Sequence, residues 1–198
     1  MIPIERKTAG RNEKKATLKK EGGRRRFPSI VLVFVALWSL SGVFPASPPL
    51  FASTDPQPLQ MTAHLYFATT DHTFLTAEER ILPRENDPAE VGKSIVEALI
   101  EGPKRDLMRT LPKETVLKSV YVTEEGTAYV DFSDAIRKHH PGGVRMETVS
   151  IYSIVNSLIL NIDRIKAVKL LIGGREAQTL AGHIDSRFPF SANMLIIR

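Results

Sequence analysis

The chain has 198 residues, of which 27 are Lys or Arg and 22 are Asp or Glu, and it contains no cysteine. The lack of cysteine excludes disulfides, thiolate catalysis, cysteine-ligated metals and attachment of a lipid to a cysteine. Ten basic residues and three acidic ones lie within residues 1–26, so the remainder, with 17 basic and 19 acidic residues, is nearly neutral. The pI of 9.5 therefore describes a basic tail and does not predict a domain that binds nucleic acid.

An uncharged segment follows the basic tail at residues 27–44. Its length of about 18 residues is close to the minimum that spans a bilayer core of about 30 Å. Because the basic cluster precedes it, the positive-inside rule places the N-terminus in the cytoplasm and residues from 45 onward outside. We predict a single-pass signal anchor in the cytoplasmic membrane, with the tail near anionic lipid. A cleaved signal peptide is the alternative, since Leu50 and Ala52 give a tolerable cleavage site.

Residues 45–59 are rich in proline and small residues, which predicts an extended linker. One folded domain is expected at residues 60–190, a normal size for a single hydrophobic core. A tail at residues 191–198 completes the chain. Its apolar run, Met194 to Ile197, is too short to span a membrane and is expected either to add an edge strand or to dock on a partner.

The domain is expected to begin with a strand at residues 61–69 and a second, short strand at 80–83. A helix should start after Asp87, because Asp87 can cap it, Pro88 suits the first helical position and Glu90 completes a capping box. Gly102-Pro103 should end this helix.

Two β-rich runs, residues 115–123 and 127–132, are separated by a Glu-Glu-Gly turn and predict a hairpin. After Gly142-Gly143, an apolar stripe over residues 145–162 predicts a second, more buried helix. A last hairpin is expected from residues 167–172, through Gly173-Gly174, to a partner strand near residues 176–180. This order of elements predicts an α+β fold with two helices on one face of a small mixed sheet.

No group of residues predicts a reaction centre. Asp131 and Asp134 flank Phe132-Ser133 and could form an acid–base pair, but a short turn after the strand, capped by Ser133 or Asp134, is the better explanation. The five histidines are scattered along the sequence, so no metal site, cofactor or enzyme activity is predicted. These histidines are His64, His72, His139, His140 and His183.

Several segments together resemble the GerMN domain family, named for the sporulation and germination protein GerM. They are His64-Leu-Tyr-Phe67, Ala98-Leu-Ile-Glu-Gly-Pro103, Ala128-Tyr-Val-Asp-Phe-Ser133, Gly142-Gly143 and Leu180-Ala-Gly-His-Ile-Asp185. The resemblance covers about residues 61–190. It implies an extracytoplasmic bacterial module, similar to the ring-building domains of sporulation channels, that assembles or scaffolds and has no catalytic residues. This chain lacks the lipid-modified cysteine and the tandem domain pair common in GerM-like proteins, so what carries over is fold, topology and scaffolding.

The leading hypothesis is therefore a non-catalytic, membrane-anchored domain of the bacterial cell envelope that associates with itself or with another envelope protein. The alternative is a module that binds peptidoglycan or other glycans. For this alternative the sequence offers the polar loop Arg137-Lys-His-His140 and the aromatic residues Phe188 and Phe190.

Overall fold

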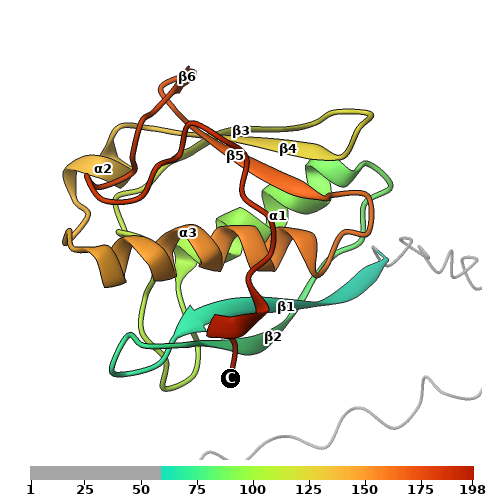
Figure 1. The fold of residues 1–198 in the computed structure, drawn as a ribbon. Coiled ribbons are helices and arrows are strands. Elements are labelled where there is room, and N and C mark those ends of the chain that lie inside the picture. The colour runs from blue at the N-terminus through green and yellow to red at the C-terminus, as the bar shows by residue number, and fades with distance from the viewer. Residues whose placement is uncertain (1–58) are drawn as a thin grey trace, which may run out of the picture. The chain divides into compact units, whose positions relative to one another are not determined.

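Two helices lie between two separate β-sheets in residues 59–198, which are the residues that this computed structural model describes (Figure 1). The first sheet is a two-stranded antiparallel hairpin, and the second has four strands. The elements, in chain order, are β1 (Gln60–Ala68), β2 (Leu75–Pro83), α1 (Pro88–Glu101), β3 (Leu117–Val122), β4 (Thr127–Phe132), α2 (Ala135–Lys138), α3 (Val144–Ile159), β5 (Ala167–Ile172), β6 (Arg175–Glu176) and the 3₁₀ turn η1 (Met194–Ile196).

The four-stranded sheet has the order β3-β4-β5-β6, with β4 and β5 parallel and the other neighbours antiparallel. Parallel neighbours need a long crossover connection, which here contains α2 and α3. For this four-stranded sheet, the predicted α+β fold with two helices against a mixed sheet is confirmed. The prediction of a single sheet was wrong, since β1 and β2 form their own sheet on the other side of the helices (Figure 1).

Strand β1 stays apart from the second sheet because side chains of α3 and of the turn after it occupy its free edge. Asn161 accepts a hydrogen bond from the His64 amide and donates to the His64 carbonyl, each at 2.8 Å. Ser157 accepts from the Tyr66 amide at 3.0 Å, and Ser153 donates to the Tyr66 carbonyl at 2.6 Å. A buried strand edge must be paired somewhere, and these side chains do what a neighbouring strand would otherwise do.

The carboxyl end of α1 is held by arginines from outside the helix. Arg109 donates to the carbonyls of Ile100 and Glu101, and Arg80 donates to the Gly102 carbonyl at 2.7 Å. Cations are favourable at this end of a helix dipole, and α1 has no basic residue in its own last turn. Arg80 also forms an ion pair with the buried Glu78 at 2.6 Å. The Glu78 carboxylate accepts further hydrogen bonds from the amides of Lys104 and Arg105, in the turn that follows α1.

The predicted cap at Asp87 and the predicted glycine turn agree with the structure, whereas the Glu90 carboxylate pairs with Lys93 at 3.7 Å and does not complete the capping box. Asp87 caps α1 by accepting from the Ala89 amide at 2.9 Å, with Pro88 as the first helical residue. Gly126 in the β3–β4 turn has φ of +91°, and a Cβ there would lie 2.6 Å from the Arg164 carbonyl oxygen. Only glycine satisfies both conditions, which explains the Glu-Glu-Gly turn.

Three elements differ from the prediction by more than two residues or in type. Strand β2 begins at Leu75 rather than Arg80 and pairs with β1 along its whole length. Strand β6 has two residues and not five, since Ala177 and Leu180 turn away from the sheet and are buried. The C-terminal run forms η1, and Ile197 makes a single bridge to Leu75 at the edge of β2.

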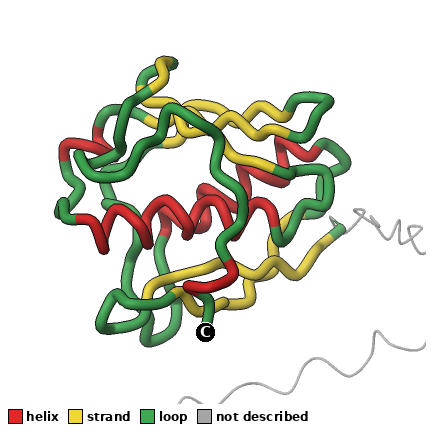
Figure 2. Tube along the Cα trace, viewed as in Figure 1, coloured by secondary structure: helices red, strands yellow, loops and turns green. Residues whose placement is uncertain are grey.

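A long loop connects β6 to η1 and crosses from one sheet to the other beside α3 (Figure 2). Phe190 exchanges two backbone hydrogen bonds with Val168 of β5. Asn156 of α3 exchanges two more with the backbone of Asn193, each at 2.9 Å. The C-terminal segment therefore ties α3 to both sheets.

The predicted tail, anchor and most of the linker, residues 1–58, lie outside the described residues. Within residues 59–198, none of the helices has both the length and the apolar character needed to cross a bilayer.

We expect Ser157→Ala to lower the free energy of unfolding by about 1–3 kcal/mol, because the buried Tyr66 amide would lose its partner. Chemical denaturation of the two proteins under identical conditions would measure the difference. Ser191→Ala, at an exposed serine, is the matched control and should change stability by less than about 0.5 kcal/mol. Equal effects of the two substitutions would contradict the proposed role of α3 as a partner of the β1 edge.

Candidate binding site

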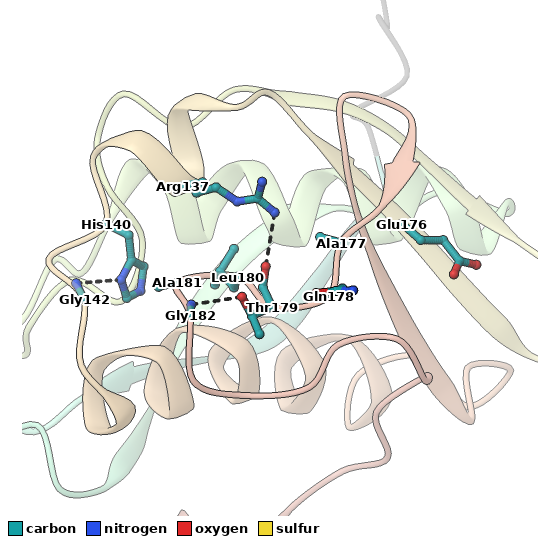
Figure 3. Close-up of a pocket in the computed structure, with 10 residues that line it drawn as sticks. All are labelled: Arg137, His140, Gly142, Glu176, Ala177, Gln178, Thr179, Leu180, Ala181 and Gly182. Carbon is teal, nitrogen blue, oxygen red and sulfur yellow. Dashed lines mark hydrogen bonds between the residues drawn. The ribbon is translucent and has the colours of Figure 1, made fainter.

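A hollow of about 610 Å³ lies between α2 and the loop that follows β6 (Figure 3). Arg137 of α2 and His140 stand on one side, and the backbone of residues 176–182 forms the other. Arg137 donates to the Thr179 carbonyl at 3.2 Å, and Thr179 Oγ1 accepts from the Gly182 amide at 3.0 Å. The hollow therefore has a polar wall whose loop is held in place by its own hydrogen bonds.

Glu147 of α3 fixes the floor of this loop. The residue is fully buried, and its two carboxylate oxygens accept from the amides of Ala181 at 2.7 Å and His183 at 2.8 Å. The His183 ring lies 3.2 Å from the same carboxylate. Burial raises the pKa of Glu147, but the hydrogen bonds from Ala181, His183 and Ile184 together lower it by more than burial raises it. The pKa therefore lies below its ordinary value.

His140 is held as a neutral ring with a defined tautomer. Its Nδ1 accepts from the Gly142 amide at 3.0 Å, so the ring proton must reside on Nε2, which lies 3.0 Å from Ser150 Oγ. Ser150 in turn donates to the Thr110 carbonyl. Burial lowers the pKa of His140; the charge of Glu147 raises it and that of His183 lowers it, and the pKa lies below 6.5.

This arrangement does not activate Ser150 as a nucleophile. A catalytic base must accept the hydroxyl proton, whereas the His140 nitrogen facing Ser150 is itself a donor. Ser150 is also fully buried, out of reach of a substrate. Among residues 59–198, no three His, Asp or Glu side chains are grouped so that they could hold a metal ion.

The aspartates considered as an acid–base pair have separate structural roles. Asp131 accepts from the Gly174 amide at 2.8 Å, which fixes the β5–β6 turn. Asp134 is the residue before α2, but its side chain does not form the predicted cap, and its carboxylate instead forms an ion pair with Lys138 at 3.1 Å.

The residues predicted for glycan recognition do not form one surface. Arg137 and His140 line the hollow, but His139 does not. Phe190 packs edge-on against Tyr152 with ring centroids 6.1 Å apart, whereas Phe188 is 70% exposed. Phe190 is therefore part of the packing of the domain, whereas Phe188 is exposed to solvent.

A second hollow, which the sequence did not suggest, lies on the face of the four-stranded sheet opposite the helices. Its volume is about 440 Å³. Tyr121 and Tyr129 are directly paired across β3 and β4, and Tyr121 is 64% exposed. We call this region the tyrosine surface. It consists of Ser119, Tyr121, Thr123, Tyr129, Asp131 and Leu171. The signal was present in the alternation of β3 and β4, which places both tyrosines on the face away from the core.

The fold and these sites define an α+β domain in which the buried Glu147, Ser150 and Asp131 side chains make structural hydrogen bonds. The sequence model of the family described as "Germane: Sporulation and spore germination" matches residues 64–178, more than half of the chain. The chain therefore belongs to this family, which confirms the resemblance found from the sequence.

Two solved structures from Bacillus subtilis show the same fold. The first GerMN domain of the sporulation protein GerM is 22% identical, with a TM-score of 0.53, and the match covers 67% of this chain and 96% of that one. The tandem GerMN domains of the same protein are 21% identical, with a TM-score of 0.55, and the match covers 67% of this chain and 46% of that one. No match was found among curated proteins.

We expect Glu147→Gln to destabilise the domain by about 1–3 kcal/mol. The two carboxylate oxygens accept from the amides of Ala181 and His183, and a glutamine side chain has only one acceptor oxygen, so one of these amides would lose its partner. Hydrogen exchange at residues 181–184 should accelerate. Glu97→Gln, at an exposed position of α1, is the control and should leave this exchange unchanged. Unaltered protection of residues 181–184 in the Glu147→Gln variant would contradict the role assigned to Glu147.

The lowered pKa of His140 predicts a pH dependence of stability. Between the pKa of 6.5 expected in the unfolded chain and the lower pKa of the folded state, the unfolded chain binds more protons. The contribution of His140 is therefore complete above pH 6.5 and is lost as the pH falls through the folded pKa. Denaturation midpoints measured across this range should fall less steeply for His140→Gln than for the unchanged protein. His139→Gln, at an exposed neighbour, should retain the slope.

Proposed function

We propose that the chain is a non-catalytic, membrane-anchored interaction domain that acts outside the cytoplasm as a scaffold in the bacterial cell envelope. Family membership supports the envelope and sporulation-related setting, and the uncharged segment at residues 27–44 supplies the proposed anchor. The orientation, with the N-terminus inside and the domain outside, follows from the basic tail.

The observation that carries this proposal is the tyrosine surface. Exposed tyrosines present a large apolar ring with one polar atom, and such residues are enriched at the energetic centres of protein interfaces. Leu171 and Tyr129, both partly exposed, extend the apolar area beside Tyr121. In contrast, the carboxylate of Glu147 and the ring of His140 are already engaged within the domain, so they are not free for chemistry.

We propose that a protein binds this surface, and that a second copy of the chain is its first candidate partner. The full chain in detergent should form dimers or larger species by light scattering. Tyr121→Ser should weaken association about tenfold, the loss expected for an interface tyrosine worth about 1.4 kcal/mol. Glu97→Ser, on α1 at the other face of the sheet, should have no effect.

A photo-crosslinking amino acid at position 121, introduced into the full chain in cells, would identify the partner. Crosslinks at 121 that are absent with the same group at position 97 would support the proposal. A strict monomer at high concentration with no crosslinked protein would contradict it. Pelleting of the full chain with purified wall material, unaffected by Tyr121→Ser, would instead favour the glycan-binding alternative.

A further inference from the structure

Three aliphatic side chains protrude where η1 approaches the first turn of α3. Val144 is 58% exposed, Met194 is 59% exposed and Leu195 is 89% exposed. Between the first turns of α3 and η1 lies a shallow hollow of about 410 Å³, which is lined by Val144 and by Ile196, the residue that follows Met194 and Leu195. We call Val144, Met194 and Leu195 the apolar tip.

The backbone that carries the tip is fixed and not frayed. Asn193 caps η1 by accepting from the Leu195 amide at 3.0 Å, while Asn156 holds the backbone of Asn193 at 2.9 Å on both its amide and its carbonyl. After η1, the Arg198 amide donates to the Leu75 carbonyl at 2.8 Å. The fold therefore keeps the Leu195 side chain exposed to solvent, beside the exposed Met194, and exposed apolar patches mark interaction sites when their side chains are contiguous.

Positive charge accompanies the tip. Arg145 follows Val144 directly and is exposed. Arg198 is also exposed, with its guanidinium 3.9 Å from the centroid of the Phe74 ring. The adjoining β1–β2 turn adds one negative charge, because hydrogen bonds from Thr69 and Thr73 lower the pKa of Asp71 to about 2 and keep it ionised, so the two arginines outnumber it.

We propose that the apolar tip docks on the anionic lipid surface of the membrane that holds the chain. Aliphatic side chains flanked by arginines suit the boundary between acyl chains and headgroups, where each arginine contributes about 1 kcal/mol. Three protruding side chains form a smaller contact than the roughly 800 Å² per partner of a stable protein interface, which favours lipid over protein.

This inference rests on the proposed membrane anchor, because the anchor keeps the bilayer within reach. The predicted linker over residues 45–58 would span at most about 50 Å when fully extended, at roughly 3.6 Å per residue. A tether of this length raises the effective concentration of the tip at the membrane, so even a weak contact is populated.

The test uses the full chain in lipid nanodiscs. Because the chain contains no cysteine, Val144→Cys carries a single environment-sensitive fluorophore without further changes. With phosphatidylglycerol in the disc, we expect a blue-shifted emission that lipid-borne nitroxides quench, and a weaker signal in discs of phosphatidylcholine alone. Lys113→Cys, at an exposed loop position, is the control label and should stay unquenched in both.

Added substitutions test the tip with the same label. Arg145→Gln should lower the ratio of docked to undocked domain about fivefold, as expected for one lost arginine at an anionic surface. Leu195→Ser should abolish quenching. Leu160→Ser, which changes another exposed leucine at the far end of α3, should leave it intact.

The outcomes separate the docking from the anchor. If the chain resists alkaline carbonate extraction but the label at 144 stays unquenched in anionic discs, the docking is overturned and the anchor stands. If carbonate releases the chain, the anchor fails; anionic vesicles are then added to the released chain, and an unshifted label overturns the docking too. A shift that follows protein density and not anionic lipid would assign the tip to a second copy and would also overturn the inference.

Discussion

The hydrogen bonds between the α3 region and the free edge of β1 are the constraint on which the domain depends. Ser153, Ser157 and Asn161 lie at successive four-residue intervals and satisfy alternate residues of one strand. This pairing ends the first sheet at two strands and lets the helices lie between two sheets. Breaking one such bond leaves a buried polar group unpaired, which costs more than an average hydrogen bond contributes.

The same helix organises the rest of the domain through residues on its other turns. Glu147 fixes the loop that walls the polar hollow, and Asn156 fixes the segment that carries the apolar tip. Because Glu147 and Asn156 already make structural hydrogen bonds, the side chains that are free to bind a partner lie on the outer surfaces. The tyrosine surface and the apolar tip lie on different elements, so the proposed protein association and the proposed lipid contact would use separate surfaces.

Sequence patterns predicted the elements whose causes are local. Asp87-Pro88 marked the start of α1, and the apolar stripe of α3 marked a buried helix. The second sheet was missed because its separation depends on contacts such as the one between Asn161 and His64, which are 97 residues apart. The contact of Glu147 with the loop at residues 181–183 was missed for the same reason. For the β1 edge a usable signal was present, namely Ser153, Ser157 and Asn161 spaced four residues apart within the predicted buried helix.

The dependence of β1 on α3 also constrains when the domain can form. The first strand emerges from the ribosome early, but its edge partners follow 91 and 97 residues later. Contacts this distant in sequence close late, so the N-terminal hairpin has an unpaired edge until most of the chain has been made. The polar residues of the α3 region that stabilise the finished domain therefore also delay its formation.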